Sequence, residues 1–305
     1  MDALLSHLLR SDPAPLDTAL SSWWSAAAPI RERFDDTVER ALALGLVAPS
    51  VGAAFVGGYR SALHRMVPWL GRHTRAALCA SELRGAHPKH IETRVVALRD
   101  GLRLNGTKRY VTGARDADQL LVLAVTSVDA DGRNLFSIIK VAPDAPGVTF
   151  EEMPATPFVP DVSHASVTFT KVHVAPEDKL YGDGWTEFVK PFRTVEDLHV
   201  QAAVTGLLLG VLRRHAGPEN VFERLAAHAL TLRALSVTTL NEPTTHVALA
   251  GSFSNLDAII EALDAWWPTA PSELSESWTR DRMLLTVARN AREARRVKAW
   301  SALRG

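Results

Sequence analysis

The chain has 305 residues, of which 47% are hydrophobic and 22% charged, so it is long enough to bury a core and to form two or three modest domains. Its 34 basic and 34 acidic side chains balance, which excludes the overall field that would favour nucleic acid or an anionic membrane. The single cysteine, Cys79, excludes an internal disulfide and a thiolate metal site. With no signal-peptide pattern and no apolar run long enough for a membrane span, we expect a cytoplasmic protein.

The first 78 residues have a helical pattern. Between residues 17 and 46, apolar side chains such as Trp23, Phe34 and Leu42 recur at three- and four-residue intervals, and Gly45 and Pro49 follow as helix breakers. A second stretch, residues 53–78, has the same character. We therefore expect an N-terminal helical domain over residues 1–78.

The pattern then changes to short alternating or β-branched runs between residues 94 and 174. Turn sequences separate these runs, among them Arg-Asp-Gly at residues 99–101 and Asp-Ala-Asp-Gly at residues 129–132. Several short strands punctuated in this way are typical of an antiparallel sandwich or barrel. We expect this β-domain to occupy residues 79–180.

From residue 185 to the end the helical period returns. The segments with the strongest period are residues 195–212, 221–235, 256–267 and 280–303. They predict a C-terminal helical bundle over residues 185–305. The whole chain is thus expected to have an α+β fold in which two helical domains flank a β-domain.

Four sequence segments of the β-region occur, in the same chain order, in one known family. They are CASE (residues 79–82), LNGTKRYVTGARDADQLLVLA (104–124), APGVTF (145–150) and ASVTFTKVHVAPEDKLYGDG (165–184). In order and spacing they resemble the middle domain of the acyl-CoA dehydrogenase superfamily, and the likeness covers roughly residues 78–210. The resemblance implies the fold more directly than the chemistry, because the two separate readily.

The resemblance also implies a flavin site. In this family the segments T-E-P-x-A-G-S-D and W-I-T form the flavin wall, which needs hydroxyl donors, an aromatic face and small residues near phosphate. By position, Ser81 and Glu82 correspond to T-E, Tyr110 to the tryptophan and Thr112 to the threonine near flavin N5. His87 stands where a small serine normally serves phosphate, and a histidine could donate to that phosphate or block the pocket.

The catalytic base is less clear from the same comparison. An active dehydrogenase needs a carboxylate to remove the α-proton of the thioester. The C-terminal glutamate of many members corresponds here to Arg289, which cannot act as a base. Other members carry the base in the first helix of the C-terminal domain, where Glu196 matches it. The alternative interpretation is that Glu196 is a first-turn acid favoured by the helix dipole, after Thr194 as N-cap.

Three functions remain open from the sequence. The first is a flavin-dependent acyl-CoA dehydrogenase, the second a flavin-dependent monooxygenase of the same superfamily, and the third a non-catalytic relative that serves in binding or assembly. FAD is the expected cofactor, but a family loop that contacts it is reduced here to residues 213–220, so FMN or no flavin would also fit. By resemblance the partners are an acyl-CoA substrate and further copies of the chain, as a homodimer or homotetramer.

The histidines and arginines suggest further interpretations. The histidines lack metal-site spacing, so we expect no metal. His199 lies one helical turn after Glu196, where a satisfied interior histidine is the simpler interpretation. The basic residues of the last helix would form a solvated face, pair with acidic side chains or bind a CoA phosphate; they are Arg289, Arg292, Arg295, Arg296 and Lys298.

Overall fold

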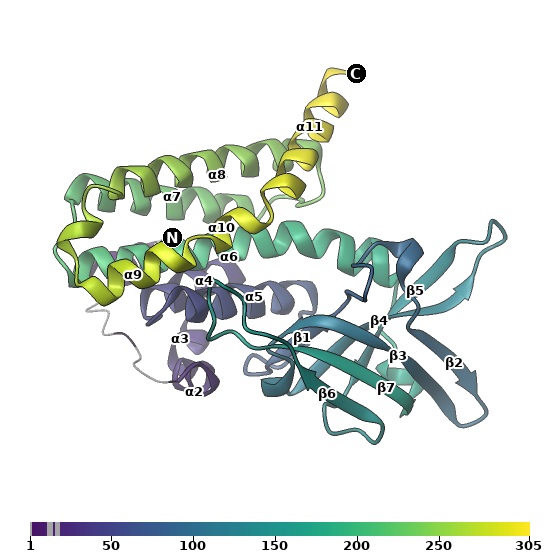
Figure 1. Cartoon of the computed structure of the whole chain (residues 1–305). Coiled ribbons are helices and arrows are strands. Elements are labelled where there is room, and N and C mark those ends of the chain that lie inside the picture. The colour runs from purple at the N-terminus through teal and green to yellow at the C-terminus, as the bar shows by residue number, and fades with distance from the viewer. Residues whose placement is uncertain (1, 11–14, 16–18) are drawn as a thin grey trace. The chain divides into compact units, whose positions relative to one another are not determined.

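The protein is described by a computed structural model that covers residues 2–10, 15 and 19–305. The chain divides into two compact units (Figure 1). Unit 1 is helical and contains the described residues of Met1–Arg65, together with Thr156–Pro160 and Thr194–Gly305. Unit 2 contains the strands and comprises Met66–Ala155 and Asp161–Arg193. The predicted α+β fold, with helical segments before and after a β-region, is confirmed.

The described residues before the β-region form five helices. They are α1 (Asp2–Arg10), α2 (Leu20–Ala26), α3 (Ala28–Arg33), α4 (Thr37–Leu46) and α5 (Val51–Met66). The predicted helical stretch begins at Asp17, which lies outside the described residues, and the rest of it is divided at Ala27 and Phe34 rather than continuous. Asp36 is the N-cap of α4, and its carboxylate Oδ1 accepts hydrogen bonds from the backbone N–H groups of Val38 and Glu39 at 2.9 and 3.0 Å.

Six helices follow the β-region. They are α6 (Lys190–Arg214), α7 (Glu219–Ser236), α8 (Pro243–Leu263), α9 (Ser272–Asp281), α10 (Leu284–Val287) and α11 (Arg289–Arg304). Within unit 1, α8 packs against both α7 and α11 (Figure 1). The buried face of α6 is built from small and aliphatic residues, including Ala203, Leu208 and Leu209, which are fully buried. This helix therefore supplies much of the apolar core of unit 1.

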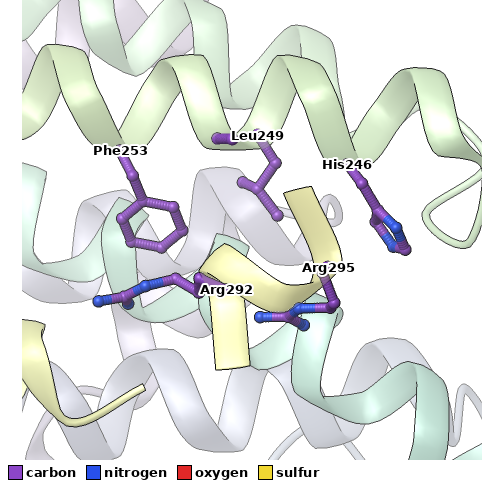
Figure 2. Close-up of a pocket in the computed structure, with 6 residues that line it drawn as sticks. His246, Leu249, Phe253, Arg292 and Arg295 are labelled. Atoms are coloured by element: carbon purple, nitrogen blue, oxygen red, sulfur yellow. The ribbon is translucent and has the colours of Figure 1, made fainter. Parts of the chain in front are cut away.

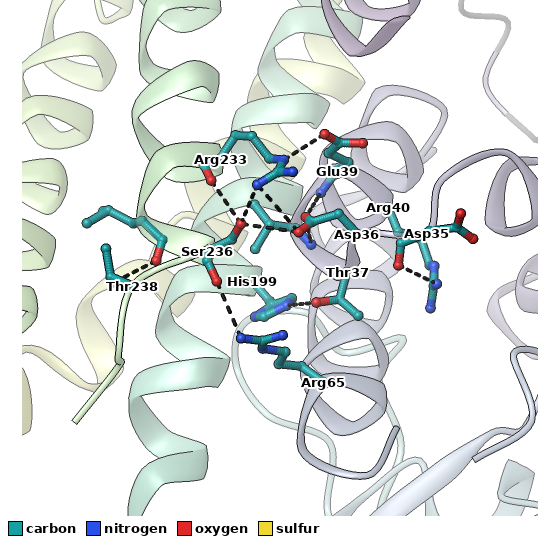
Figure 3. Close-up of polar contacts among 12 residues, drawn as sticks. Asp35, Asp36, Thr37, Glu39, Arg40, Arg65, His199, Arg233, Ser236 and Thr238 are labelled. Carbon is teal, nitrogen blue, oxygen red and sulfur yellow. Dashed lines mark hydrogen bonds and ion pairs between the residues drawn. The ribbon is translucent and has the colours of Figure 1, made fainter. Parts of the chain in front are cut away.

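A polar network joins α4 to α7 inside unit 1 (Figure 3). The Nε of Arg233 on α7 donates to the Oε1 of Glu39 at 2.6 Å, and its guanidinium lies 3.6 Å from the carboxylate of Asp36. The hydroxyl of Ser236 also donates to Asp36, at 3.2 Å. One arginine thus holds two carboxylates at the start of α4, and the network stabilises the docking of α4 on α7.

Unit 2 is built on one curled sheet of seven strands. The strands are β1 (Ala76–Cys79), β2 (Arg94–Leu98), β3 (Gly101–Thr112), β4 (Gln119–Val128), β5 (Asn134–Val141), β6 (Val148–Glu152) and β7 (His164–Val174). Their order is β1-β4-β2-β3-β7-β6, and β5 pairs with β4. The pairs are antiparallel except that β4 runs parallel to β1 and, at a single residue pair, to β2. Buried aliphatic residues such as Leu104, Val122 and Val167 form the core of this sheet.

Two segments differ from the sequence prediction. Residues 53–78 were expected to be helical throughout, but α5 ends at Met66 and Leu78 lies in strand β1. The reason is that Ala76 to Cys79 pair with β4, a tertiary contact that overrides the local apolar pattern. Helix α8 was expected from residue 256 but begins at Pro243, because its first turns carry threonines and a histidine that obscure the helical period.

One helical segment, Gly184–Arg214, is long and apolar enough by composition to cross a membrane. Within the fold, 89% of its apolar stretch is buried. It therefore occupies the position of a core helix, whose apolar surface is covered by protein.

Candidate functional site

Strand β3 departs from regular geometry at Tyr110. The pairing of β3 with β7 shifts register between Lys108 and Val111, so Tyr110 lies in a β-bulge. Its backbone φ is 56°, in the left-handed region that bulky residues rarely adopt. The residue is 62% exposed, and its backbone N–H approaches the Sδ of Met153 at 3.3 Å. The bulge therefore turns an aromatic ring out of the sheet at the cost of backbone strain.

Two of the other predicted site residues lie beside this bulge. The carbonyl of Ser81 accepts a hydrogen bond from the backbone N–H of Arg109 at 2.8 Å, which sets Ser81 against the residue before Tyr110. Thr112 is two residues beyond Tyr110 and pairs across the sheet with His164 on β7. The structure thus brings Ser81, Tyr110 and Thr112 together at one end of β3.

Two buried polar atoms flank the same bulge without a partner. Among the described residues, neither the Nε of Arg109 nor the Nδ1 of His164 has a hydrogen-bond partner. Buried donors and acceptors in folded proteins are normally paired, and an exception needs an explanation.

Glu82, predicted to contact the cofactor, forms an ion pair and hydrogen bonds within unit 2. Its Oε1 forms an ion pair with the Nζ of Lys108 at 2.8 Å, and Lys108 also donates to the carbonyl of Ala80. The same carboxylate accepts hydrogen bonds from the backbone N–H groups of Glu92 and Thr93, at 2.8 and 3.0 Å. Glu82 therefore holds both ends of the turn between β1 and β2 against β3.

Burial governs the charge state of this pair. Burial raises the pKa of the Glu82 carboxyl, but the Lys108 ammonium and the two backbone donors outweigh it and hold that pKa below its ordinary value. Burial likewise lowers the pKa of the Lys108 ammonium, and the negative charge of Glu82 opposes the change. We regard both groups as charged at neutral pH, because each satisfies the other inside the sheet.

His87 lies on the exposed turn that Glu82 anchors. Its Nδ1 accepts a hydrogen bond from the backbone N–H of Lys89 at 3.3 Å, and its ring lies 5.3 Å from the ring of His90. It begins the short 3-10 turn Pro88–His90. The described contacts of His87 are thus local ones within the turn.

Glu196, the predicted base, is a half-buried residue of α6 in unit 1. The alternative interpretation, a first-turn acid after Thr194 as N-cap, is wrong. Helix α6 begins at Lys190 and is preceded by the π-helical turn Gly184–Val189, whose N-cap is Asp183. Glu196 is therefore in the second turn of α6 or later, where the dipole effect has faded.

The residue after Glu196 forms an ion cluster that sequence reasoning missed. Asp197 is buried, and its carboxylate accepts hydrogen bonds from Arg292 at 3.4 Å and from Arg295, both on α11. Burial raises the pKa of Asp197, although the two guanidiniums oppose the change. The three-residue spacing of Arg292 and Arg295 was the available signal, since it places both on one helix face.

His199 is an interior histidine with both ring nitrogens engaged, as the simpler interpretation predicted. Its Nδ1 lies 2.7 Å from the carbonyl of Val195, and its Nε2 lies 2.8 Å from the hydroxyl of Thr37. Burial lowers the pKa of His199 to about 4. The ring is therefore neutral at pH 7 and fixes α6 to the start of α4.

Comparisons with known proteins identify both the β-domain and the fold. Residues 77–172 match the family model described as acyl-CoA dehydrogenase, middle domain. The probable acyl-CoA dehydrogenase YngJ of Bacillus subtilis (strain 168) is 28% identical over 120 residues, which cover 39% of this chain and 31% of that protein. The match thus spans about a third of the length of that curated relative.

Two solved structures are similar over nearly the whole chain. The FAD complex of PigA has a TM-score of 0.71 at 15% identity, covering 100% of this chain and 98% of that one. Butyryl-CoA dehydrogenase from Megasphaera elsdenii has a TM-score of 0.67 at 13% identity, covering 94% and 88%. At these identities the likeness establishes a common fold, and function has to be argued from the site.

Proposed function

Because the chain has the acyl-CoA dehydrogenase fold and residues 77–172 belong to that family's middle domain, we propose that the protein is a flavin-dependent oxidoreductase acting on an acyl-CoA thioester. The bulge of β3 carries this proposal. It turns the exposed ring of Tyr110 outward next to Ser81 and Thr112, on a backbone conformation that is strained for a tyrosine.

The residues around the bulge have the chemistry that an isoalloxazine ring needs. Tyr110 offers an aromatic face for the ring system. The hydroxyls of Ser81 and Thr112 would offer hydrogen-bond donors to the polar edge of the ring. Bound flavin would supply the hydride acceptor. FAD is the first choice of cofactor, and FMN would make the same contacts with this domain.

Glu82 has a supporting role in this proposal. Its carboxylate forms an ion pair with Lys108 and accepts hydrogen bonds from two backbone N–H groups, all within unit 2. The ion pair fixes Ser81, the preceding residue, in place next to β3. His87 stays a proposed phosphate contact, since its ring is on the surface of the turn.

The proposed base is Glu196. Glu196 is half-buried and lies in the helix where, by resemblance, other members of the family carry their base. The neighbouring Asp197 is held by two arginines of α11, which fixes the rotation of α6 about its axis at this point. Glu196 is thereby carried on a rigid element.

A second candidate function is a flavoprotein that binds but does not dehydrogenate. The observation that favours it is Arg289, which stands at the position of the family's C-terminal glutamate and is exposed at the start of α11. In that case flavin would bind, and no acyl thioester would bleach it. Anaerobic mixing of the flavin-loaded protein with acyl thioesters therefore separates the two functions.

The substitution Tyr110→Gly is expected to have opposite effects on flavin affinity and on stability. Removing the ring should weaken flavin binding about tenfold or more, because a stacked aromatic face is lost. The same change should stabilise the flavin-free protein by about 1 kcal/mol, since glycine adopts a φ of 56° without strain. Fluorescence titration with FAD and FMN measures the first effect, and thermal unfolding measures the second.

Lys171→Gly is the matched control, because Lys171 is an exposed residue of the same sheet with a φ of 53°. It should stabilise the protein to a similar degree and leave flavin affinity unchanged. If the two variants bind flavin equally well, Tyr110 has no part in the site.

The substitution Glu196→Gln is expected to slow reduction of the bound flavin at least about 100-fold, because general-base catalysis contributes on that scale. The measurement is the rate of flavin bleaching after anaerobic mixing with short-, medium- and long-chain saturated acyl-CoA thioesters. Glu293→Gln, an exposed residue of α11, is the control and should react at the parent rate. An unchanged rate in Glu196→Gln would remove Glu196 from the mechanism.

A further inference from the structure

Unit 1 has a pocket of its own between α8 and α11 (Figure 2). One side is apolar and the other carries cationic side chains; the lining residues are His246, Leu249, Ala250, Phe253, Arg292 and Arg295. In Figure 2 the side chains of Phe253 and Leu249 point from α8 toward the two arginines of α11. The pocket is therefore amphipathic, with a charged floor below an apolar wall.

The arginines are held in place by the ion cluster of α6. Arg295 donates from one nitrogen to Asp197 and from the other to the hydroxyl of Thr194, at 2.9 Å. Arg292 donates to Asp197 at 3.4 Å and to the carbonyl of Leu285. These contacts fix both guanidiniums in one orientation before any ligand arrives, which reduces the entropy lost on binding.

These contacts leave donors unused. A guanidinium carries five N–H donors, and two hydrogen bonds are formed by each arginine within the described structure. The ring of Phe253 covers one face of Arg292, with 4.1 Å between the Cζ of the guanidinium and the ring centroid. The remaining N–H groups lie in the plane of each guanidinium, where an oxyanion accepts two hydrogen bonds at once.

The charge of the pocket is also unbalanced. Two guanidiniums share the single buried carboxylate of Asp197. Asp257 acts on Arg292 from a distance, but it is exposed and forms no ion pair with Arg292 in the described structure. Burial, followed by the charge of Arg295, lowers the pKa of His246, so its ring is neutral at pH 7. Burial also lowers the pKa of Arg292, which is the penalty expected for a cation that lacks full compensation.

We propose that this pocket binds a small organic anion, with a carboxylate or phosphate group against Arg292 and Arg295 and an apolar body along Leu249 and Phe253. The proposal concerns unit 1 alone and does not depend on flavin binding. The neutral ring of His246 lines the edge of the pocket (Figure 2), with its Nε2 at 3.5 Å from the hydroxyl of Thr194.

Calorimetric titration of the full chain with benzoate, phenyl phosphate, inorganic phosphate and benzyl alcohol tests the proposal. Benzoate or phenyl phosphate should bind saturably, and whichever binds more tightly identifies the preferred anionic group. Benzyl alcohol should not bind, because it lacks the charge. Absence of saturable binding by both aromatic anions, or equal binding of benzyl alcohol, would overturn the proposal; inorganic phosphate binding as tightly as phenyl phosphate would refute the role of the apolar wall.

Three variants assign the binding to the pocket. Arg295→Gln should weaken anion binding about tenfold or more, since a charge-assisted hydrogen bond is lost. Asp197→Asn should tighten it, because the amide oxygen still accepts a hydrogen bond and holds the guanidiniums while the competing negative charge is removed; weaker binding in this variant would contradict the competition. Arg296→Gln, whose guanidinium pairs with Glu293 on α11, should bind as the parent does. Equal affinities in Arg295→Gln and Arg296→Gln would contradict the assignment.

Discussion

Replacing Gly206 with alanine is expected to destabilise the protein by about 3 kcal/mol, at the upper end of the range for an overfilled core. Gly206 lies on α6, and a Cβ added there would meet the backbone carbonyl oxygen of Leu42 on α4 at 2.0 Å. A carbonyl of a helix cannot rotate away, so the two helices would have to separate and lose their packing. Gly45 on α4 is in a similar position, with the carbonyl oxygen of Ala203 on α6 at 1.9 Å.

Gly251→Ala is the matched control for this prediction. Gly251 is an interior residue of α8, and no atom lies within 4 Å of a Cβ added there. Alanine should therefore stabilise the helix by about 0.5–1 kcal/mol through its higher propensity. Denaturant unfolding followed by far-ultraviolet circular dichroism should give opposite signs for the two variants. Two variants that unfold at the same denaturant concentration would disprove the close contact between α4 and α6.

Lys108→Met is expected to cost about 3–5 kcal/mol of stability, because it leaves the buried carboxylate of Glu82 without its cation. The Lys108 side chain is fully buried, and Glu82 is 8% exposed. The loss should exceed that of Lys140→Met, whose ion pair with Asp178 in the same unit is partly exposed and worth about 1 kcal/mol or less. Denaturant unfolding measures both variants.

The double variant Lys108→Met with Glu82→Gln distinguishes the ion pair from simple packing. Replacing both members of a buried pair is often close to neutral, so this variant should recover most of the stability lost in Lys108→Met. If the double variant is as unstable as the single one, the unpaired carboxylate of Glu82 is not the cause of the loss. Both variants remove the ion pair that holds the turn containing Ser81 against β3. Both should therefore also reduce flavin affinity.

The order of helical and β segments could be predicted from hydrophobic period alone, but short elements could not. The four residues of β1 are apolar without alternation, and they form a strand only because β4 lies beside them. The helix prediction through Leu78 was wrong for that reason. Similarly, the start of α6 at Lys190 depends on the cap by Asp183 and a π-helical turn, which a residue-by-residue period does not reveal.

The candidate site could likewise be predicted only in part from the sequence. Motif resemblance brought Ser81, Tyr110 and Thr112 forward, and the structure gathers them at one end of β3. Alternation along a regular strand would point Lys108 and Tyr110 to the same face. The bulge between them interrupts the alternation of side chains, so that Lys108 is buried and Tyr110 is exposed.

The sequence places Arg292 and Arg295 on one helix face but does not identify their partner. Arg292 and Arg295 were among five basic residues with three possible roles, and only the fold separates them. Arg296 pairs with Glu293 on its own helix, as a solvated face requires, whereas Arg292 and Arg295 pair with Asp197 nearly a hundred residues earlier. Such a pair depends on the packing of α6 against α11, which local pattern does not encode.

Flavin binding is tested most directly by the visible absorption spectrum of the purified chain after incubation with FAD or FMN and removal of the free flavin. We expect a yellow protein with a protein-bound flavin spectrum, and weaker retention by Tyr110→Gly than by Lys171→Gly. A parent protein that stays colourless after exposure to both flavins would show that the bulge of β3 does not serve a flavin.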